Sequence, residues 1–271
     1  MLFRSVAYIV DDSQARFLFV GPECLACGQD ALKQTETKPT LVAMEAGDHG
    51  VQTFEAWRDA QPAHDLAPGV PPESTALLLY TSGTTGDPKG VAYTHRSVVL
   101  HGIAAGLSGA LGFSSFDVIM PCQSLYHATA WGLPFAGAIN GAKFVLPCDK
   151  LDGASLHELV KTEGVTFSGG VPTIWTMYLD HLARTGEDTG TLERVVIGGS
   201  AVPRAMAETF EKQYGVKVRQ IWGMTEMSPL GVLATPSAKI ASLGNDEMDH
   251  ILWTRQGRLQ FGVELKLLDD A

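Results

Sequence analysis

The stretch RVVIGGSAVPRAMAETFEKQYGVKVRQI, residues 194–221, decides the fold. It opens with a short apolar run, RVVI, of the kind found in buried strands, and residues 203–214 then have the length and composition of a helix. Pro203 suits the first helical turn, where a missing N–H costs nothing, and Gly215 stands where a C-cap glycine belongs. A second apolar run follows at 216–221. The stretch therefore predicts a strand–helix–strand unit of a parallel sheet.

The same alternation of short apolar runs and helical segments extends toward the N-terminus of this stretch. Strands that alternate with helices of ~10–13 residues indicate βαβ units, so the predicted fold class is α/β, with parallel-rich sheets and flanking helices. By contrast, residues 28–72 carry the least pattern and are predicted to form surface loop. The remaining predicted elements are strands at 76–80, 91–94, 142–146 and 165–167, and helices at 97–107, 154–163 and 172–183.

The composition is that of a globular protein. The 271 residues include 20 Lys and Arg against 30 Asp and Glu, a net charge of −10, with 45% hydrophobic and 18% charged residues. An excess of acid argues against a nucleic-acid surface or an anionic-membrane binder. No apolar run reaches the ~18 residues of a membrane span, and the N-terminus lacks a signal-peptide pattern. The sequence therefore predicts a soluble, cytoplasmic protein.

Two of the four cysteines form a C-x-x-C pair. A structural zinc site at Cys24 and Cys27 would require a second pair of ligands at similar spacing, which the sequence lacks. Redox chemistry would place the pair at the start of a helix after a strand, and residues 20–24 fit that only loosely. The preferred interpretation is two small loop residues in a reducing compartment. Cys122 and Cys148 are the other two cysteines.

In an open α/β sheet, ligands bind beyond the carboxyl ends of the strands. Applied to the predicted strands, this rule selects four loops, three of them rich in glycine or small hydroxyl residues. These loops are residues 81–90, 168–171, 198–202 and 222–226.

The first of these loops, TSGTTGDPKG at 81–90, holds three glycines, four hydroxyls and one lysine. Glycines let backbone N–H groups turn toward a ligand, and hydroxyls and an ammonium group donate to phosphate oxygens. The Walker A pattern G-x-x-x-x-G-K-S/T fails, because Pro88 stands before Lys89 and Gly90 follows it. Composition alone favours a phosphate-binding loop and a ligand-free hairpin tip equally.

Two further loops offer complementary groups. In WGMTE at 222–226, Trp222 could stack on a base, Thr225 could reach a phosphate and Glu226 could hold Mg²⁺. An aromatic plug at the sheet end beside a solvated glutamate explains the same residues equally well. The glycines of 198–202 would let a flat ring approach the backbone, and Ser200 could donate or cap, although many βα turns have this composition.

These loops together resemble the acyl-adenylate-forming (AMP-binding) superfamily of acyl-CoA synthetases, luciferases and peptide-synthetase adenylation domains. The superfamily pattern S/T-S/T-G-S/T-S/T-G-x-P-K-G is matched at 81–90, and Y/W-G-x-T-E is matched at 222–226, more than 100 residues further on. Gly198-Gly-Ser-Ala is similar to the turn that flanks adenine in the family. PCQSLYHATAW at 121–131 resembles the P-x-x-x-x-F/Y-H-x-x-x-W stretch of fatty-acyl ligases.

The resemblance implies a reaction in two steps. A carboxylate attacks the α-phosphate of ATP and releases pyrophosphate, and a thiol, usually that of CoA, then displaces AMP from the acyl-adenylate. ATP/AMP and Mg²⁺ are the implied cofactors and CoA the co-substrate. The implied catalytic residues are Lys89, Thr225, Glu226 and His127. Implied nucleotide-binding residues are Thr81, Ser82, Gly83, Thr84, Thr85, Gly86, Lys89, Gly198, Gly199, Ser200, Trp222, Gly223, Met224 and Thr225. Implied acyl-site residues are His127, Trp131, Gly170, Val171 and Gly223, and implied Mg²⁺ ligands are Thr84 and Glu226.

The sequence itself allows a second interpretation of two residues, His127 and Asp117. His127 is also explained as a buried histidine with a satisfied ring, which the residues alone favour. Asp117 superficially resembles the amino-acid-anchoring aspartate of peptide synthetases, but a strand-end position is preferred for it.

The resemblance further predicts the extent and the activity of the protein. Residues 1–271 are expected to be an internal fragment of the large AMP-binding domain, without the small C-terminal domain that carries the catalytic lysine. The predicted function is that of an acyl-CoA ligase for medium- or long-chain fatty acids. The alternatives are a nucleotide-binding fragment without turnover, an adenylating enzyme that uses another carboxylate or thiol acceptor, and a folded remnant that binds nothing.

Overall fold

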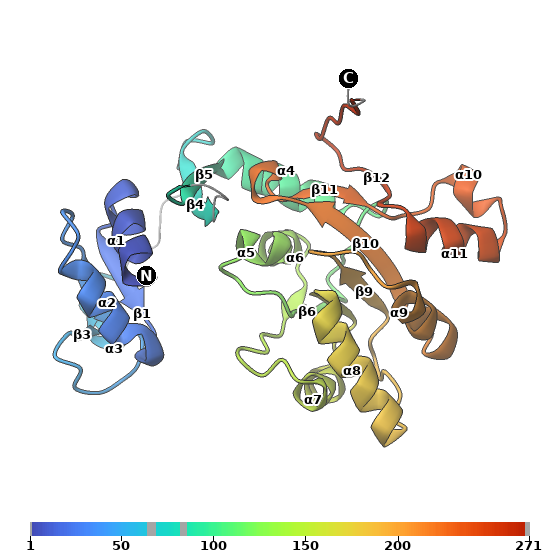
Figure 1. The fold of residues 1–271 in the computed structure, drawn as a ribbon, viewed down its shortest axis with the longest axis horizontal. Coiled ribbons are helices and arrows are strands. Elements are labelled where there is room, and N and C mark those ends of the chain that lie inside the picture. Colours follow the sequence, from blue (N-terminus) through green and yellow to red (C-terminus); the bar gives the residue numbers. More distant parts are fainter. Residues whose placement is uncertain (1, 64–68, 82–85, 269–271) are drawn as a thin grey trace. The chain divides into compact units, whose positions relative to one another are not determined.

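The computed structural model describes residues 2–63, 69–81 and 86–268, with side chains from Ser5 onward (Figure 1). The chain divides into two compact units, Met1–Ala92 and Tyr93–Ala271. None of the helices in these described ranges is long and apolar enough to cross a membrane.

The first unit is built on a small parallel sheet with the strand order β1-β2-β3. Phe19 on the first strand contacts Trp57, with ring centroids 5.0 Å apart and nearly perpendicular planes, so an edge-to-face aromatic contact helps to hold the sheet to α3. The elements of this unit are α1 (Leu2–Asp12), β1 (Phe17–Val20), a 3-10 turn (Pro22–Cys24), α2 (Leu25–Leu32), β2 (Thr40–Ala43), β3 (Gln52–Thr53) and α3 (Phe54–Asp59).

The prediction of surface loop for residues 28–72 is wrong at several places between residues 28 and 59. This stretch contains the end of α2, the strands β2 and β3, and α3. Strands of two to four residues are too short for a periodic pattern, and pairing with the distant β1 stabilises them instead. The interpretation of Cys24 and Cys27 as loop residues is also wrong, because Cys24 ends the 3-10 turn and Cys27 lies in α2.

The glycine-rich stretch at 81–90 joins two paired strands. β4 (Thr75–Thr81) and β5 (Lys89–Thr94) form a two-stranded sheet of their own, which confirms the predicted pair of strands. The rule that places ligands at the carboxyl ends of a parallel sheet therefore does not apply to this loop, contrary to the sequence-based expectation.

The second unit contains a seven-stranded sheet in the order β12-β11-β10-β9-β8-β6-β7. The strands β10, β9, β8, β6 and β7 are parallel to one another. By contrast, β11 pairs antiparallel with β10, and β12 pairs antiparallel with β11. This arrangement confirms the α/β class with a parallel-rich sheet. The strands are β6 (Val118–Pro121), β7 (Lys143–Phe144), β8 (Phe167–Gly170), β9 (Arg194–Ile197), β10 (Lys217–Gly223), β11 (Leu230–Leu233) and β12 (Arg258–Leu259).

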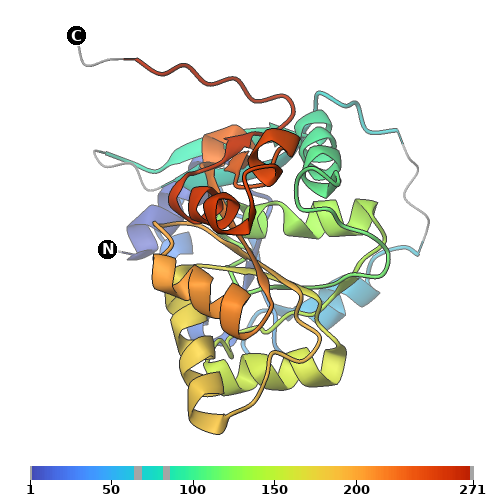
Figure 2. The ribbon, with the colours of Figure 1, turned by 90° about the vertical axis from the view of Figure 1, so that its right-hand side faces the viewer.

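Helices cover both faces of this sheet because its central strands are apolar on both sides. Along β9, Val195 and Ile197 join one core cluster while Val196 joins the other, as the two-residue repeat of a strand requires. Figure 2 shows the second unit from a direction at right angles to Figure 1. One face carries α7 (Gly153–Glu163), α8 (Pro172–Thr185), α9 (Arg204–Glu208) and α11 (Asn245–Thr254), and the other carries α4 (His95–Gly106), α5 (Ala128–Trp131) and α6 (Leu133–Ile139).

Most predicted elements of this unit are confirmed, with shifted ends. β9 has its predicted bounds, whereas β8 begins two residues later than expected and extends to Gly170. The helix predicted at 203–214 is an α-helix that continues as a π-helical turn, Thr209–Gln213. β6 was not predicted. Asp117 directly precedes it, which confirms the strand-end position, and forms a buried ion pair with Arg194.

Candidate active site at the carboxyl edge of the sheet

The turns that follow β8, β9 and β10 meet at one edge of the sheet. The backbone N–H of Gly198 donates to the carbonyl of Gly170, with an N–O distance of 3.4 Å. A methyl group on Gly199 would lie 3.1 Å from Val171, and one on Gly198 only 2.5 Å from the side chain of Ile221. Three of the four predicted loops therefore come together, and glycine is what lets their backbones approach so closely.

The turn after β10 exposes the groups that the sequence singled out. A bulge between Trp222 and Gly223 shifts the register of the pairing with β11, and a methyl group on Gly223 would lie 2.1 Å from the carbonyl oxygen of Pro229. The Trp222 ring is 40% exposed, which argues against the alternative of an aromatic plug. Glu226 is exposed, and no described residue forms an ion pair or hydrogen bond with its carboxylate.

A residue that the sequence analysis missed forms a hydrogen bond with the backbone of this turn. Tyr93 is 3% exposed, and its hydroxyl donates to the backbone carbonyl of Thr225. Burial, together with the nearby charge of Glu226, raises the pKa of Tyr93 to about 12, so the hydroxyl keeps its proton. Tyr93 lies within an ordinary apolar strand pattern, and only the folded chain brings it to Thr225.

His101 is a second missed residue beside the same turn. Its Nε2 accepts a hydrogen bond of 3.3 Å from the backbone N–H of Leu230, which follows the turn. Burial lowers the pKa of His101 to about 4, so the ring is neutral at ordinary pH. A methyl group on Gly132 would lie 2.5 Å from this ring, so the start of α6 also packs against it.

The His127 stretch contains an uncommon backbone. Four consecutive residues, Ala128 to Trp131, have φ between +47° and +60°, which is one turn of left-handed helix. Such a turn costs roughly 1–2 kcal/mol for each non-glycine residue. The buried side chain of Gln123 donates to the carbonyl of Ala130 over 2.9 Å and so helps to hold the turn. His127 itself is exposed, so the alternative of a buried histidine is wrong, while Trp131 is buried at 9% exposure.

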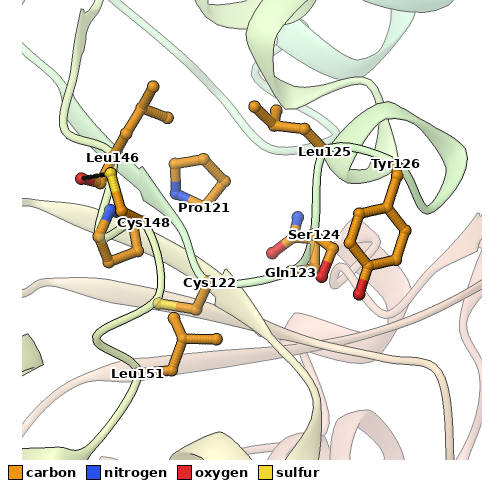
Figure 3. A pocket seen from close by; sticks show the side chains of 10 residues that line it. Pro121, Cys122, Gln123, Ser124, Leu125, Tyr126, Leu146, Cys148 and Leu151 are labelled. Atoms are coloured by element: carbon orange, nitrogen blue, oxygen red, sulfur yellow. Dashed lines mark hydrogen bonds between the residues drawn. The ribbon is translucent and has the colours of Figure 1, made fainter. Parts of the chain in front are cut away.

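A pocket of about 220 Å³ lies beside this stretch, beyond the ends of β6 and β7 (Figure 3). Its wall is mostly apolar. Burial raises the pKa of the Cys122 thiol to about 12, and Ser168 hydrogen bonding lowers it only in part, so this cysteine is no nucleophile near neutral pH. The lining residues are Pro121, Cys122, Gln123, Ser124, Leu125, Tyr126, Leu146, Pro147, Cys148 and Leu151.

The fourth predicted loop is described only at its two ends. Thr81 ends β4, Gly86 has a φ of +110°, and the exposed Lys89 begins β5. Ser82, Gly83, Thr84 and Thr85 lie outside the described residues. Gly170 ends β8 and Val171 follows it, and Ser200 and Met224 are exposed.

Comparison with known proteins identifies the family. A sequence model described as "AMP-binding enzyme" matches residues 4–271. The chain belongs to this family. Over 255 residues it is 44% identical to a 3-methylmercaptopropionyl-CoA ligase of Ruegeria lacuscaerulensis, covering 94% of this chain and 44% of the relative. It is 46% identical over 203 residues to a medium-chain-fatty-acid–CoA ligase of Ectopseudomonas oleovorans, covering 75% of this chain and 37% of the relative.

A solved structure has the same fold. An anthranilate–CoA ligase in complex with anthranoyl-AMP superposes with a TM-score of 0.83 at 23% identity, covering 100% of this chain and 49% of that one. The AMP-binding chain described here thus spans less than half of the length of each of these relatives.

Proposed function

We propose that this chain is the nucleotide- and acyl-binding part of an AMP-forming acyl-CoA ligase that activates medium- or long-chain fatty acids. The observation that carries the proposal is the meeting of three turns at one sheet edge, with Trp222, Thr225 and Glu226 on the turn after β10. The names of the relatives support carboxylate activation and transfer to CoA.

The first step places nucleotide groups on these turns. Adenine would lie between the Gly198–Gly199 backbone and the exposed ring of Trp222. Thr225 would donate to the α-phosphate, on which negative charge builds as the carboxylate attacks. Tyr93 acts as a positioning residue, because it fixes the carbonyl of Thr225 from the buried side.

Mg²⁺ fits the residues at this turn. The Glu226 carboxylate is exposed and has no described partner, and hard divalent cations prefer such oxygen ligands. Thr84, the second proposed ligand, belongs to the undescribed part of the loop. When bound, Mg²⁺ would offset the negative charge on the phosphates.

Lys89 would bind the β- and γ-phosphates. It is exposed at the start of β5. The match of residues 81–90 to the family pattern supports the proposal that Lys89 acts on the same nucleotide as Glu226.

The acyl group would occupy the region around the left-handed turn. His127, exposed at the start of this turn, would contact the carboxylate, while Trp131, Gly170 and Val171 would line the path of the chain. The mostly apolar pocket beside Gln123 suits an alkyl chain better than a charged substrate.

Nucleotide binding tests these assignments residue by residue. Calorimetry with AMP and with Mg-ATP should give binding of both by the 271-residue chain. Lys89→Ala should weaken ATP at least about tenfold and leave AMP within roughly twofold, because only ATP carries the phosphates that Lys89 contacts. Trp222→Ala should weaken both ligands. The exposed Lys239 supplies the matched control, Lys239→Ala. Equal ATP affinity of Lys89→Ala and the unchanged protein would overturn the assignment.

Turnover separates the ligase from its main alternative. The chain is incubated with ATP, Mg²⁺, CoA and octanoate, and AMP and pyrophosphate are measured. Acyl-CoA formation supports the ligase, whereas AMP binding without release of pyrophosphate favours a nucleotide-binding fragment without turnover.

A further inference from the structure

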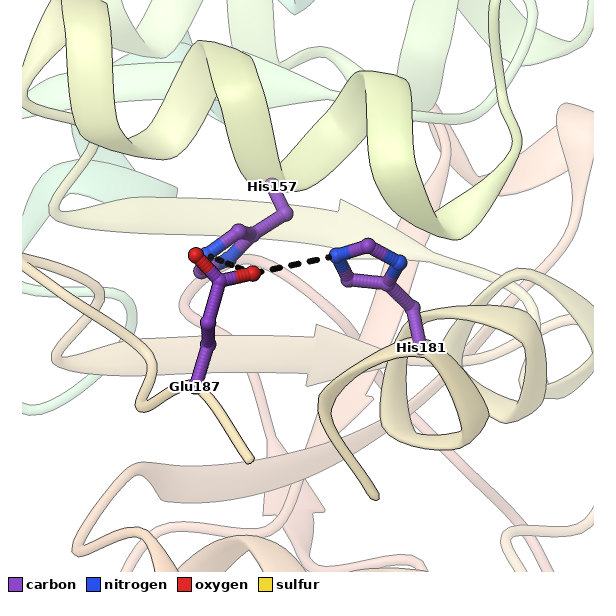
Figure 4. A group of neighbouring side chains, drawn as sticks. All are labelled: His157, His181 and Glu187. Atoms are coloured by element: carbon purple, nitrogen blue, oxygen red, sulfur yellow. Dashed lines mark ion pairs between the residues drawn. The ribbon is translucent and has the colours of Figure 1, made fainter. Parts of the chain in front are cut away.

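Three side chains that take no part in the proposed nucleotide site converge on the other side of the fold's second unit, between two helices. His157 lies on α7, His181 lies on α8, and Glu187 lies directly after Gly186, the residue that caps the end of α8 (Figure 4). Oε2 of Glu187 is 3.3 Å from Nε2 of His157 and 3.5 Å from Nε2 of His181. One ligand atom from each residue lies within 4.8 Å of the others.

The inner histidine has a polar atom without a hydrogen-bond partner. The side chain of His157 is only 5% exposed, and among the described residues its buried Nε2 makes no hydrogen bond, although Glu187 lies so near. Its other nitrogen, Nδ1, is 3.5 Å from the hydroxyl of Tyr178. Leaving a buried polar nitrogen without a hydrogen-bond partner costs free energy, so a ligand bound to Nε2 would explain this arrangement.

The packing of the two helices fixes the histidines at this distance. A methyl group on Gly153 would lie 2.3 Å from the carbonyl oxygen of Met177 and 2.7 Å from Cβ of His181. The absence of a side chain at Gly153 therefore lets α7 and α8 approach closely. The ring centroids of His157 and His181 are 5.3 Å apart as a result.

The carboxylate is oriented by a lysine. Oε1 of Glu187 accepts a hydrogen bond of 2.9 Å from Lys161, which leaves Oε2 directed at the two rings.

We propose that His157, His181 and Glu187 form a binding site for a divalent transition-metal ion, best suited to Zn²⁺. Zinc bound at about 2.0–2.1 Å by nitrogen and oxygen in a tetrahedron holds its ligand atoms about 3.3–3.4 Å apart, close to the two distances observed here. Two imidazoles favour zinc over magnesium or calcium, which prefer oxygen ligands throughout.

The site offers three protein ligands and an open fourth position. A groove of about 260 Å³ reaches the cluster, lined also by Ala154, Glu158 and Thr162, so that water could complete the tetrahedron. Because the ligands come from α7, α8 and the segment after α8, bound zinc would join three parts of the chain and stabilise the second unit. Tyr178 would orient the His157 ring from behind, as outer partners of metal-bound histidines commonly do.

Zinc and cobalt binding to the 271-residue chain test the site. The double variant Cys24→Ser/Cys27→Ser serves as the background, because this pair, with Cys24 exposed and Cys27 half-buried, could also bind metal. We expect one equivalent of Zn²⁺ by calorimetry, a higher melting temperature with zinc, and the visible absorption of tetrahedral Co²⁺. His181→Ala and the shape-conserving Glu187→Gln should each weaken zinc at least about tenfold. Circular dichroism confirms that each variant is folded.

A control variant keeps the test decisive. His250→Ala removes an exposed histidine of α11 and should leave zinc affinity unchanged. A plain network of ion pairs predicts no stoichiometric zinc binding. That result, or equal zinc affinity of the background protein and both ligand variants, would overturn the proposal.

Discussion

The buried hydroxyl of Tyr93 donates a hydrogen bond to the backbone carbonyl oxygen of Thr225, 132 residues further along the chain. This contact joins the end of β5 to the turn that carries Glu226. Tyr93 itself belongs to neither of the two family patterns, although it contacts a residue of the second.

Removing this hydroxyl should loosen the turn. Tyr93→Phe loses one buried hydrogen bond and leaves the carbonyl oxygen of Thr225 with only its 3.3 Å bond from the N–H of Ser228, which should lower the free energy of unfolding by about 1 kcal/mol. AMP affinity should fall severalfold because Thr225 is no longer fixed. Urea unfolding and calorimetry measure both. The control is Tyr126→Phe, since Tyr126 is 89% exposed; a Tyr93→Phe protein with the AMP affinity of that control would contradict the positioning role.

Gly223 should tolerate no side chain. A methyl group there would lie 2.1 Å from the carbonyl oxygen of Pro229, so Gly223→Ala must displace the turn after β10. We expect a loss of about 2 kcal/mol or more in the free energy of unfolding and no measurable AMP binding. Gly69→Ala is the matched control, because a methyl group there meets no atom within 4 Å. Retained AMP binding in Gly223→Ala would show that the turn adapts.

His101 should make the stability of the protein depend on acid. Burial holds its pKa at about 4 in the folded chain, against an ordinary value of 6.5. As the pH falls below 6.5, His101 becomes protonated in the unfolded chain, whereas in the folded chain it stays neutral until about pH 4. Stability from the neutral ring is therefore full above pH 6.5, and about 2–3 kcal/mol of it is lost by pH 4.5.

Urea unfolding at pH 7 and pH 4.5 measures this effect. In His101→Gln the side chain retains an acceptor for the N–H of Leu230 but does not titrate, so its stability should change less between the two pH values. An identical loss in both proteins would exclude His101 as the cause.

The left-handed turn should be open to stabilisation. Thr129 has a φ of +53°, and its buried hydroxyl has no partner among the described residues. Thr129→Gly removes both penalties and should raise the free energy of unfolding by about 1 kcal/mol. Thr162→Gly, in the right-handed helix α7, should instead lower it by a few tenths of a kcal/mol, because glycine has a lower helix propensity than threonine. Thermal melts decide the matter, and destabilisation by both glycines would mean that the turn is not strained.

Local pattern accounts for the parts of the fold that were predicted. The apolar run at 194–197 and the capping residues around 203–215 depend on neighbours in the sequence, so β9 and the helix after it could be inferred. β6 was missed because four residues ending in Pro121 have no pattern that outweighs the proline, and pairing with β8 and β7 makes them a strand. The short strands β2 and β3 were missed for a similar reason.

The candidate site likewise has one part that the local sequence predicts and another that only the folded chain shows. Glycine, threonine, tryptophan and glutamate at 222–226 form a pattern that is legible without coordinates, and the family match agrees with it. That Tyr93 lies under this turn, and that His101 accepts from Leu230, could not be inferred, because each pairs residues more than 100 positions apart.

The sequence by itself determined the family, the alternation of strands and helices and the chemical types of the proposed nucleotide-binding residues, because these are properties of short stretches of chain. Only the tertiary structure decided which side chains face one another. Tyr93 meets Thr225, and His157, His181 and Glu187 surround one point, because sheet order and helix packing bring distant residues together. Such distances arise from the closing of the whole core, and no local pattern of residues specifies them.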